Sequence, residues 1–362
     1  MWSGGEKTKG LLLAGGHGTR LRPLTYAGNK HLLPIANKPM LLYGLEHLKN
    51  AGIREIAVVL GPIREGVREL LGDGANFDVN LTYLEQPDPK GIAHAVMIAE
   101  DFVGEESFVV YLGDNLLKEG VSRFRRIFEE RKADCVLGVT PVKNPSSFGV
   151  VEMKNGKPVD FIEKPAKPRT NLALIGVYVF GHSIFHAVKE IEPSSRGELE
   201  VTDAIRVMLR EGRKIEVERT EGWWKDTGRP EDLLEANQLV LASLETKIEG
   251  EVSRGTRYTG SVAIGRGTKA IGTVTLRGPI IIGENCRIGP NAHIGPYTSI
   301  GDDCVLRNVE IENSIVMKGC AIESGKRIID SLIGSFSTIQ NRQARIRQGH
   351  RFIVGERSFA QV

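Results

Sequence analysis

The chain has 362 residues, of which 41% are hydrophobic and 26% charged, which fits a folded protein long enough for two domains and excludes a disordered chain. Its 48 basic and 45 acidic residues leave a formal charge of only +3, and aromatic residues make up 6%, so nucleic acid is not an expected partner. No apolar run approaches the length of a membrane span, and the first residues lack a signal-peptide core. The four cysteines lack the paired spacing of a metal or redox motif. Together these features indicate a cytoplasmic protein without a membrane partner.

The first predicted strand is an apolar run at residues 11–14 that ends abruptly in a glycine-rich loop. Three glycines within residues 15–18 are followed by Arg20 and Arg22. Glycines let backbone N–H groups approach an anion closely and the arginines supply positive charge, so the loop is a candidate phosphate-binding site. A second interpretation stays open, namely a glycine-rich turn with two solvated arginines.

Strands and helices then alternate as far as residue 141. Helices are expected at residues 41–51, 64–71, 92–101 and 121–132, and strands at residues 54–60, 81–84, 107–112 and 133–141. This alternation predicts a mostly parallel sheet with helices on both faces, in which ligands bind beyond the carboxyl ends of the strands. Because the glycine-rich loop and Gly113-Asp114 both follow strands, we expect both to face one crevice.

The pattern changes from Phe148 onward. Short strands at residues 149–153, 159–163 and 172–180 predict an antiparallel insertion or lobe that carries contacts to a second substrate. Helices follow at 183–191 and 202–211, then a strand at 214–218 and a helix from Pro230 to about residue 243, where proline suits the first turn. We expect this first domain to comprise residues 1–245.

Aliphatic side chains recur at every sixth position beyond residue 250. They are Ile264, Ala270, Leu276, Ile282, Ile288, Ile294, Ile300 and Leu306. This hexapeptide repeat is typical of a parallel β-helix in which each aliphatic residue points inward. The register slips near residues 308–313 and resumes with Val316. Residues 246–362 are therefore predicted to form a β-helix domain, with residues 340–362 as a cap over the open end of the coil.

Two aspartates follow predicted strands and are candidate metal ligands. Asp114 lies in Gly113-Asp114-Asn115, and Asp226 lies in Asp226-Thr227-Gly228. Carboxylates from two strand ends can hold Mg²⁺ together with phosphate oxygens. Taken alone, each aspartate is more typical of a turn or cap residue than of a metal ligand, and the metal-site interpretation depends on the pairing of the two.

Other polar residues suit nucleotide and sugar-phosphate chemistry. Lys30 would extend the cationic wall of the glycine-rich loop, Glu163-Lys164 pairs a hydroxyl acceptor with a phosphate-binding cation, and Gln86 could read a base edge. Lys30 also has a plain interpretation as a surface lysine, and Glu163-Lys164 as a solvated salt bridge. The eight histidines form no cluster with metal-ligand spacing, so a zinc site is not expected.

These residues belong to an ordered set of motifs. The set is Leu13-Ala14-Gly15-Gly16-x-Gly18-Thr19-Arg20, Lys30-x-Leu32-Leu33-Pro34, Lys38-Pro39, Gln86-Pro87, Leu112-Gly113-Asp114-Asn115, Phe148-Gly149, Glu163-Lys164-Pro165, Arg196-Gly197-Glu198-Leu199-Glu200 and Asp226-Thr227-Gly228. Over residues 9 to about 335 it resembles the signature of the sugar-1-phosphate nucleotidyltransferases. Within that family it is most similar to the long thymidylyltransferases, which carry a left-handed β-helix.

The resemblance implies a Rossmann-like mixed α/β sheet followed by a left-handed β-helix, and an enzyme that transfers a nucleotidyl group from dTTP to glucose-1-phosphate with release of pyrophosphate. It implies Mg²⁺ held by Asp114 and Asp226, and Arg20, Lys30, Lys164 and Asp114 as catalytic groups. The nucleotide would be bound by Leu13, Gly15, Gly18, Thr19, Arg20, Gln86, Gly91 and Asp114. The sugar phosphate would be bound by Asn115, Phe148, Gly149, Glu163, Lys164 and Leu174.

Three alternatives remain open at this stage. The substrates could be UTP or an amino-sugar-1-phosphate, and the β-helix could add acetyltransferase activity with His293 as a base. The chain could also be a non-catalytic regulatory subunit, although the presence of Arg20, Lys164, Asp114 and Asp226 argues against that. The regular faces of the β-helix lead us to expect a homo-oligomer.

Overall fold

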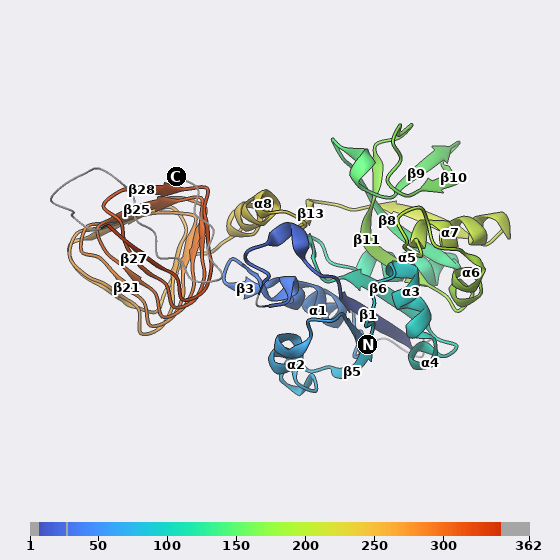
Figure 1. Cartoon of the computed structure of the whole chain (residues 1–362), viewed down its shortest axis with the longest axis horizontal. Helices are drawn as coiled ribbons and strands as arrows, with labels where there is room; N and C mark the ends of the chain where they lie inside the picture. Colours follow the sequence, from blue (N-terminus) through green and yellow to red (C-terminus); the bar gives the residue numbers. More distant parts are fainter. Residues whose placement is uncertain (1–6, 27, 342–362) are drawn as a thin grey trace. The chain divides into compact units, whose positions relative to one another are not determined.

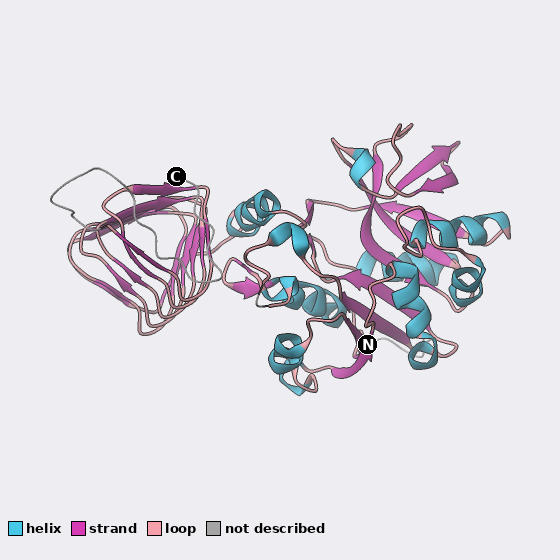
Figure 2. Ribbon diagram, viewed as in Figure 1, coloured by secondary structure: helices cyan, strands magenta, loops and turns pink. Residues whose placement is uncertain are grey.

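The computed structural model describes residues 7–26 and 28–341, and the chain divides into two compact units. The first unit comprises residues 1–17 and 40–226, and the second comprises residues 18–39 and 227–362. Figure 1 colours the chain along its sequence and Figure 2 by secondary structure. Within the described residues, none of the helices has the length and apolar character needed to cross a membrane.

A nine-stranded mixed sheet forms the centre of the first unit. Its strands are β1 (Thr8–Ala14), β4 (Glu55–Leu60), β5 (Asn80–Glu85), β6 (Ser107–Leu112), β8 (Cys135–Pro141), β9 (Val150–Lys154), β10 (Lys157–Ile162), β11 (Leu172–Phe180) and β12 (Ile215–Arg219). Seven of them lie in the order β10-β9-β11-β6-β1-β4-β5, and β8 pairs with both β11 and β12. Strands β6, β1, β4 and β5 are mutually parallel, whereas β11 runs antiparallel to β6, β8 and β9. The predicted mixed α/β sheet is confirmed.

Helices cover the sheet because its central strands are apolar on both faces. Leu11 and Leu12 point to opposite faces of β1, and both are fully buried. The helices are α1 (Met40–Asn50), α2 (Glu65–Leu71), α3 (Ile92–Ile98), α4 (Glu100–Val103), α5 (Ser122–Arg131), α6 (Ile184–Glu190) and α7 (Val201–Arg210), and short 3₁₀ turns lie at Ala75–Phe77 and Pro145–Ser147. Figure 2 shows helices along both sides of the strands. The single helix expected at residues 92–101 is divided into α3 and α4.

The antiparallel strands differ from the expected insertion in one respect. Strand β11 spans nine residues and joins the main sheet directly, pairing with β6 and β8, so only β9 and β10 extend beyond it as a hairpin. Eight of the nine residues of β11 are hydrophobic and eight are buried, as a central strand requires. A separate two-stranded sheet, β7 (Asn115–Leu117) with β13 (Trp224–Asp226), was not expected.

A left-handed β-helix forms most of the second unit. Its three parallel sheets have the orders β14-β17-β20-β23-β26-β29, β15-β18-β21-β24-β27-β30 and β16-β19-β22-β25-β28. The strands are β14 (Lys247–Ile248), β15 (Glu251–Val252), β16 (Thr256–Thr259), β17 (Val262–Ile264), β18 (Lys269–Ala270), β19 (Val274–Arg277), β20 (Ile280–Ile282), β21 (Arg287–Ile288), β22 (Ala292–Ile294), β23 (Thr298–Ile300), β24 (Val305–Leu306), β25 (Val309–Glu312), β26 (Ile315–Val316), β27 (Ala321–Glu323), β28 (Arg327–Ile329), β29 (Leu332–Ile333) and β30 (Thr338–Gln340). All eight aliphatic residues of the repeat are at most 2% exposed, which confirms the predicted inward stack.

The slip in the repeat corresponds to shorter coils. Ile282 lies beside Ile300, 18 residues later, whereas Ile300 lies beside Val316, 16 residues later. Asn308 and Asn313, which adopt left-handed backbone angles of 45° and 44° in φ, make the tightened corners. The coil therefore absorbs the missing residues at corners and keeps its inward stack.

Three of the four cysteines form a column at one corner of the β-helix. Cys286, Cys304 and Cys320 are buried, and each thiol lies near a carbonyl oxygen of the next coil, at 3.1 Å, 3.2 Å and 3.1 Å respectively. Hydrogen bonding to Cys304 and burial raise the pKa of the Cys286 thiol. The column belongs to the packed interior.

The second unit also contains a segment from the N-terminal part of the chain. Residues 18–39 hold 3₁₀ turns at Thr19–Leu21 and Lys30–Leu32 and a hairpin of β2 (Pro34–Ile35) and β3 (Lys38–Pro39), and helix α8 (Pro230–Leu241) leads into the coil. The cap expected over residues 340–362 lies, from Arg342 onward, outside the described residues.

Candidate functional site

The glycine-rich loop and Asp114 leave neighbouring strands of the first unit at the same edge. Leu13, which is 8% exposed, pairs with Leu112 across β1 and β6, and the Gly113 amide donates to the Leu13 carbonyl at 2.9 Å. The first part of the loop and the Gly113-Asp114 turn are therefore adjacent, as expected of parallel strands.

Close backbone packing explains the first glycines of the loop. Gly16 has a φ of 93°, and a Cβ added at neighbouring Gly61 would lie 3.0 Å from the Gly16 amide nitrogen. A Cβ added at Gly15 would lie 3.4 Å from Gln86 Oε1. The loop backbone thus runs directly beside the Gln86 amide.

Gln86 is almost fully buried, with 5% exposure, and its amide is held in one orientation. Its Nε2 donates to the Gly91 carbonyl at 3.1 Å and lies 3.0 Å from His94 Nδ1. Because the amide nitrogen can only donate, His94 Nδ1 must be the unprotonated acceptor. Burial lowers the pKa of His94, Lys90 lowers it further, and Asp88 opposes them, so the neutral ring is favoured. The bonds leave Gln86 Oε1 as the acceptor beside the glycine-rich loop.

Gly91 connects this amide to the segment around Leu199. It has a φ of 101°, and a Cβ there would collide with the Leu199 carbonyl oxygen. The Leu199 amide donates to the Lys90 carbonyl at 2.8 Å, and the Ala93 amide donates to the Leu199 carbonyl at 3.2 Å. Glycine is required here by both the backbone angle and the close approach.

The two candidate metal ligands come together through the β7–β13 ladder. Asp226 pairs directly with Asn115, the residue that follows Asp114. Asn115 is 3% exposed, its Nδ2 donates to Asp114 Oδ1 at 2.9 Å, and its Oδ1 accepts from Trp224 Nε1 at 2.7 Å. Residues 112 positions apart in the chain thus bring two carboxylates to one short ladder, and carboxylate oxygens are the ligands that hard divalent cations prefer.

The first residues of the predicted sugar-phosphate set pack on this ladder and on one another. The Phe148 ring meets the Trp224 ring edge-on, with centroids 5.3 Å apart. The Gly149 carbonyl accepts from the amide of Leu174, which is 5% exposed in β11. A Cβ at Gly149 would lie 2.8 Å from Glu163 Oε2, so glycine permits the carboxylate to approach the backbone.

Glu163 lies at the centre of a network of opposite and like charges. Its Oε1 is 3.6 Å from Lys164 Nζ and 3.4 Å from Arg196 Nη1, and its Oε2 accepts from Thr202 Oγ1 at 3.3 Å. Burial raises the pKa of Glu163, Glu200 adds to the rise, and Lys164, Arg196 and Thr202 oppose it. Lys164, whose φ is 39°, keeps 40% of its side chain exposed and can meet an anion.

The remaining predicted residues lie in the second unit. Gly18 has a φ of 59°, and a Cβ there would lie 3.2 Å from Lys30 Cβ and 3.1 Å from Thr25 Cγ2. Thr25 Oγ1 donates to the Gly18 carbonyl at 2.7 Å and closes the loop. Thr19 and Arg20 are exposed on the following 3₁₀ turn, so the structure brings Lys30 beside the glycine and leaves Arg20 accessible.

The residues that orient the predicted ones were not identified from the sequence. His94 orients Gln86, Trp224 orients Asn115, and Thr202 and Arg196 contact Glu163. Arg196 and Trp224 lie in or beside quoted motifs, so their positions carried a signal. His94 and Thr202 lie on helices, where nothing local marks them.

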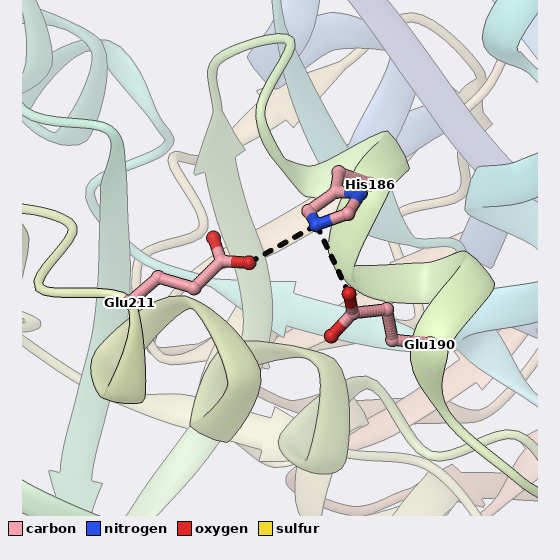
Figure 3. Close-up of side chains that lie close together, drawn as sticks. All are labelled: His186, Glu190 and Glu211. Carbon is pink, nitrogen blue, oxygen red and sulfur yellow. Dashed lines mark ion pairs between the residues drawn. The ribbon is translucent and has the colours of Figure 1, made fainter.

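One other group of described residues has metal-ligand chemistry. His186 and Glu190 on α6 and Glu211 after α7 place their ligand atoms within 4.8 Å of one another. His186 Nε2 is 3.1 Å from Glu190 Oε1 and 3.2 Å from Glu211 Oε1 (Figure 3). All three residues are exposed, and Glu211 also accepts from Arg213. The arrangement is a surface ion-pair network centred on the histidine.

Comparison with known proteins agrees with this architecture. A nucleotidyl transferase family model matches residues 9–243, and a model of the GMPPB C-terminal domain matches residues 276–358. The low-salt glycan biosynthesis nucleotidyltransferase Agl11 of Haloferax volcanii is 46% identical over 352 residues, which cover 97% of this chain and 99% of that protein. Glucose-1-phosphate thymidylyltransferase of Streptomyces antibioticus is 43% identical over 357 residues, which cover 98% and 99%.

A solved structure gives the same result for the first part of the chain. The crystal structure of a Bacillus anthracis protein described as a glucose-1-phosphate thymidylyltransferase, in complex with a sucrose, matches with a TM-score of 0.61 at 38% identity and covers 64% of this chain and 94% of that one. Since the family model spans more than half of the chain and two relatives match it over nearly their full length, the chain belongs to the nucleotidyl transferase family of enzymes.

Proposed function

We propose that this enzyme transfers the thymidylyl group of dTTP to glucose-1-phosphate and releases pyrophosphate and dTDP-glucose. The observation that carries the proposal is the pairing of Asp226 with Asn115, which joins two carboxylates at the strand edge where the glycine-rich loop begins. Full-length similarity to a glucose-1-phosphate thymidylyltransferase supports the choice of substrates.

The reaction joins two anions, so the protein must offset their repulsion. A phosphate oxygen of the sugar phosphate attacks the α-phosphorus of dTTP, the new P–O bond forms, and the bond to the β-phosphate oxygen breaks, so that pyrophosphate departs with its electron pair. Such a transfer needs positioning and positive charge more than covalent chemistry from the protein. We assign Arg20 and Lys30 to the triphosphate and Lys164 to the sugar phosphate, by resemblance to the family.

Two carboxylates beside a phosphate loop form a donor set that fits a hard divalent cation. Family members generally use a divalent metal, and we propose Mg²⁺ held by Asp114 and Asp226. When bound, the ion would neutralise charge on the phosphates. Asn115 orients the Asp114 carboxylate.

We propose that Gln86 contacts the base through its Oε1, since its Nε2 is already engaged by Gly91 and His94. The N3–H of thymine would donate to that oxygen. Uracil carries the same N3–H, so this contact recognises both bases and UTP remains the alternative nucleotide.

We propose that Gly15, Gly18 and Thr19 hold the triphosphate with Arg20, and that Leu13 and Gly91 line the nucleotide. Asn115, Phe148, Gly149, Glu163 and Leu174 would line the sugar phosphate, with Glu163 accepting from its hydroxyls. The backbone angles of Gly18 and Gly91 and the burial of Leu13 and Leu174 support these roles. We also keep the division into a nucleotidyltransferase domain (residues 1–245) and a β-helix domain with a C-terminal cap (residues 246–362), the homo-oligomer and the cytoplasmic location as proposals.

Pyrophosphate release tests the proposal. The purified chain is incubated with dTTP or UTP and with glucose-1-phosphate or an amino-sugar-1-phosphate, with and without Mg²⁺. We expect dTTP with glucose-1-phosphate to give the highest kcat/KM, Mg²⁺ to be required, and Asp226→Asn to fold but lose at least about 100-fold in rate. Asp101→Asn, an exposed carboxylate on α4, is the matched control and should be unaffected. A preference for UTP, or near-normal rates with Asp226→Asn, would overturn the corresponding part.

A further inference from the structure

A fully buried asparagine in the second unit connects helix α8, the β-helix and the segment of residues 18–39. Asn237 is 0% exposed although it lies within a helix, where asparagine is a poor choice. Its Oδ1 accepts from the Ala36 amide at 2.9 Å and from Ser299 Oγ at 3.1 Å, and its Nδ2 donates to the Tyr297 carbonyl at 3.0 Å. One amide group therefore bonds to both a β-helix coil and the hairpin of β2 and β3.

The hairpin tip makes a second bond to the same coil. Asn37 Nδ2 donates to the Ile300 carbonyl at 2.7 Å, in the strand β23 that also carries Ser299. Ala36 and Asn37 have φ values of 47° and 63°, so the two-residue turn holds an alanine in the left-handed region. Glycine would be the usual choice in such a turn, and the bonds to Asn237 and Ile300 compensate for its absence.

The hairpin is the end of the segment that carries the proposed triphosphate contacts. Lys30 lies four residues before β2 begins, and its Cβ packs beside Gly18 at the start of the segment. His31 and Ile35, at 2% and 0% exposure, bury the intervening chain. Because Lys30 packs beside Gly18 and is joined to the hairpin by a short buried stretch, we expect the hairpin tip to restrain the positions of Gly18 and Lys30.

We propose that Asn237 is a positioning residue that attaches the 18–39 segment to the β-helix, and that the β-helix thereby supports nucleotide binding in this enzyme. The inference rests on the proposed function for the identity of the nucleotide. It gives the β-helix a part in the reaction without any catalytic group of its own.

The test compares three variants with the wild-type full chain in steady-state pyrophosphate release. Asn237→Ala removes all three bonds, and we expect the KM for dTTP to rise about tenfold, with the KM for glucose-1-phosphate unchanged and kcat within about twofold. Asn37→Ala removes only the bond to Ile300 and should give a smaller rise of the same kind. Gln238→Ala is the matched control, because its Nε2 donates to Asn313 Oδ1 of the β-helix at 2.7 Å rather than to the hairpin, and its KM values should not change.

A second readout does not depend on activity. Amide hydrogen exchange of peptides within residues 18–39 should be faster in Asn237→Ala than in wild type or Gln238→Ala, in the absence of substrate. If Asn237→Ala does not fold, Asn37→Ala carries both measurements.

The proposal is wrong if a folded Asn237→Ala keeps the wild-type KM for dTTP and the wild-type exchange of residues 18–39. It is also wrong if Gln238→Ala shows the same changes, because then α8 is merely a structural attachment. Absence of activity in the wild-type chain would refute the proposed function, and the exchange experiment would still decide the role of Asn237.

Discussion

Replacing Trp224 by phenylalanine removes one hydrogen bond and leaves a buried acceptor without its donor. Trp224 Nε1 donates to Asn115 Oδ1 at 2.7 Å, and Asn115 is 3% exposed, so water cannot readily replace the indole. An unsatisfied buried acceptor costs about 1–3 kcal/mol. At about 2 kcal/mol, we expect the melting temperature of the unfolding step that includes the first unit to fall by roughly 4–8 °C.

The same substitution should also weaken metal use. The Asn115 amide orients Asp114 through the 2.9 Å bond from Nδ2 to Oδ1, and loss of its Trp224 partner frees the amide to rotate. If about 1 kcal/mol of that orientation is lost, the Mg²⁺ concentration for half-maximal pyrophosphate release rises by roughly fivefold. The phenylalanine ring keeps the contact with Phe148, so the sugar-phosphate side should change little.

Trp223→Phe is the matched control, because no side-chain hydrogen bond of Trp223 occurs among the described residues. The assays are differential scanning calorimetry and a Mg²⁺ titration of the initial rate for both variants. If Trp224→Phe has the melting temperature and Mg²⁺ requirement of wild type, the Trp224–Asn115–Asp114 chain of bonds does not support the metal site. Equal losses in the two variants would refute the reasoning as well.

Two further predictions concern the two substrates separately. The pKa of His94 is lowered, chiefly by burial, so its ring stays neutral and accepts from Gln86 Nε2 down to pH values below the ordinary 6.5. The KM for dTTP should therefore be flat above that pH and rise as the pH falls through the lowered pKa. His94→Asn should abolish this rise, and an identical pH profile in the variant would exclude His94 as its cause. At Gly149 an added Cβ would lie 2.8 Å from Glu163 Oε2, so Gly149→Ala should displace the carboxylate. We expect the KM for glucose-1-phosphate to rise about tenfold while the KM for dTTP is unchanged. Equal effects on both KM values would contradict a role confined to the sugar phosphate.

Long periodic elements were predictable because their burial repeats along the chain. The apolar run of β1, the helix now seen at Met40–Asn50 and the six-residue repeat all follow from local patterns that match their buried faces. The β-helix was the clearest case, since eight inward residues at one spacing leave few alternatives. The missing residues after Leu306 were visible as a slip, but not the way in which corner asparagines absorb them.

Short elements paired over long distances were not predictable. Strands β7 and β13 have three residues each, too few for a periodic signal, and their pairing joins Asn115 to Asp226 across the whole first unit. The motifs singled out Asp114 and Asp226 as candidate metal ligands, whereas Trp224, whose hydrogen-bond partner Asn115 lies 109 positions away, was not predicted. The place of β11 in the main sheet likewise depends on its partners β6 and β8.

The candidate site shows a similar division. Gln86 and Glu163 were singled out by residue type and motif, yet the groups that orient them, His94 and Thr202, come from helices brought close by the fold. The attachment of residues 18–39 to the β-helix through Asn237 joins positions about 200 apart, which no local pattern reveals.

The column of cysteines allows the opening of individual β-helix coils to be followed by thiol labelling. Cys286, Cys304 and Cys320 are buried, so a thiol reagent reaches each only when the coil around it opens. Their reactivities, resolved by mass spectrometry, would therefore measure how fast successive coils unwind and from which end. The same thiols that contact the neighbouring coils thus distinguish one coil from the next and report the order in which they unwind.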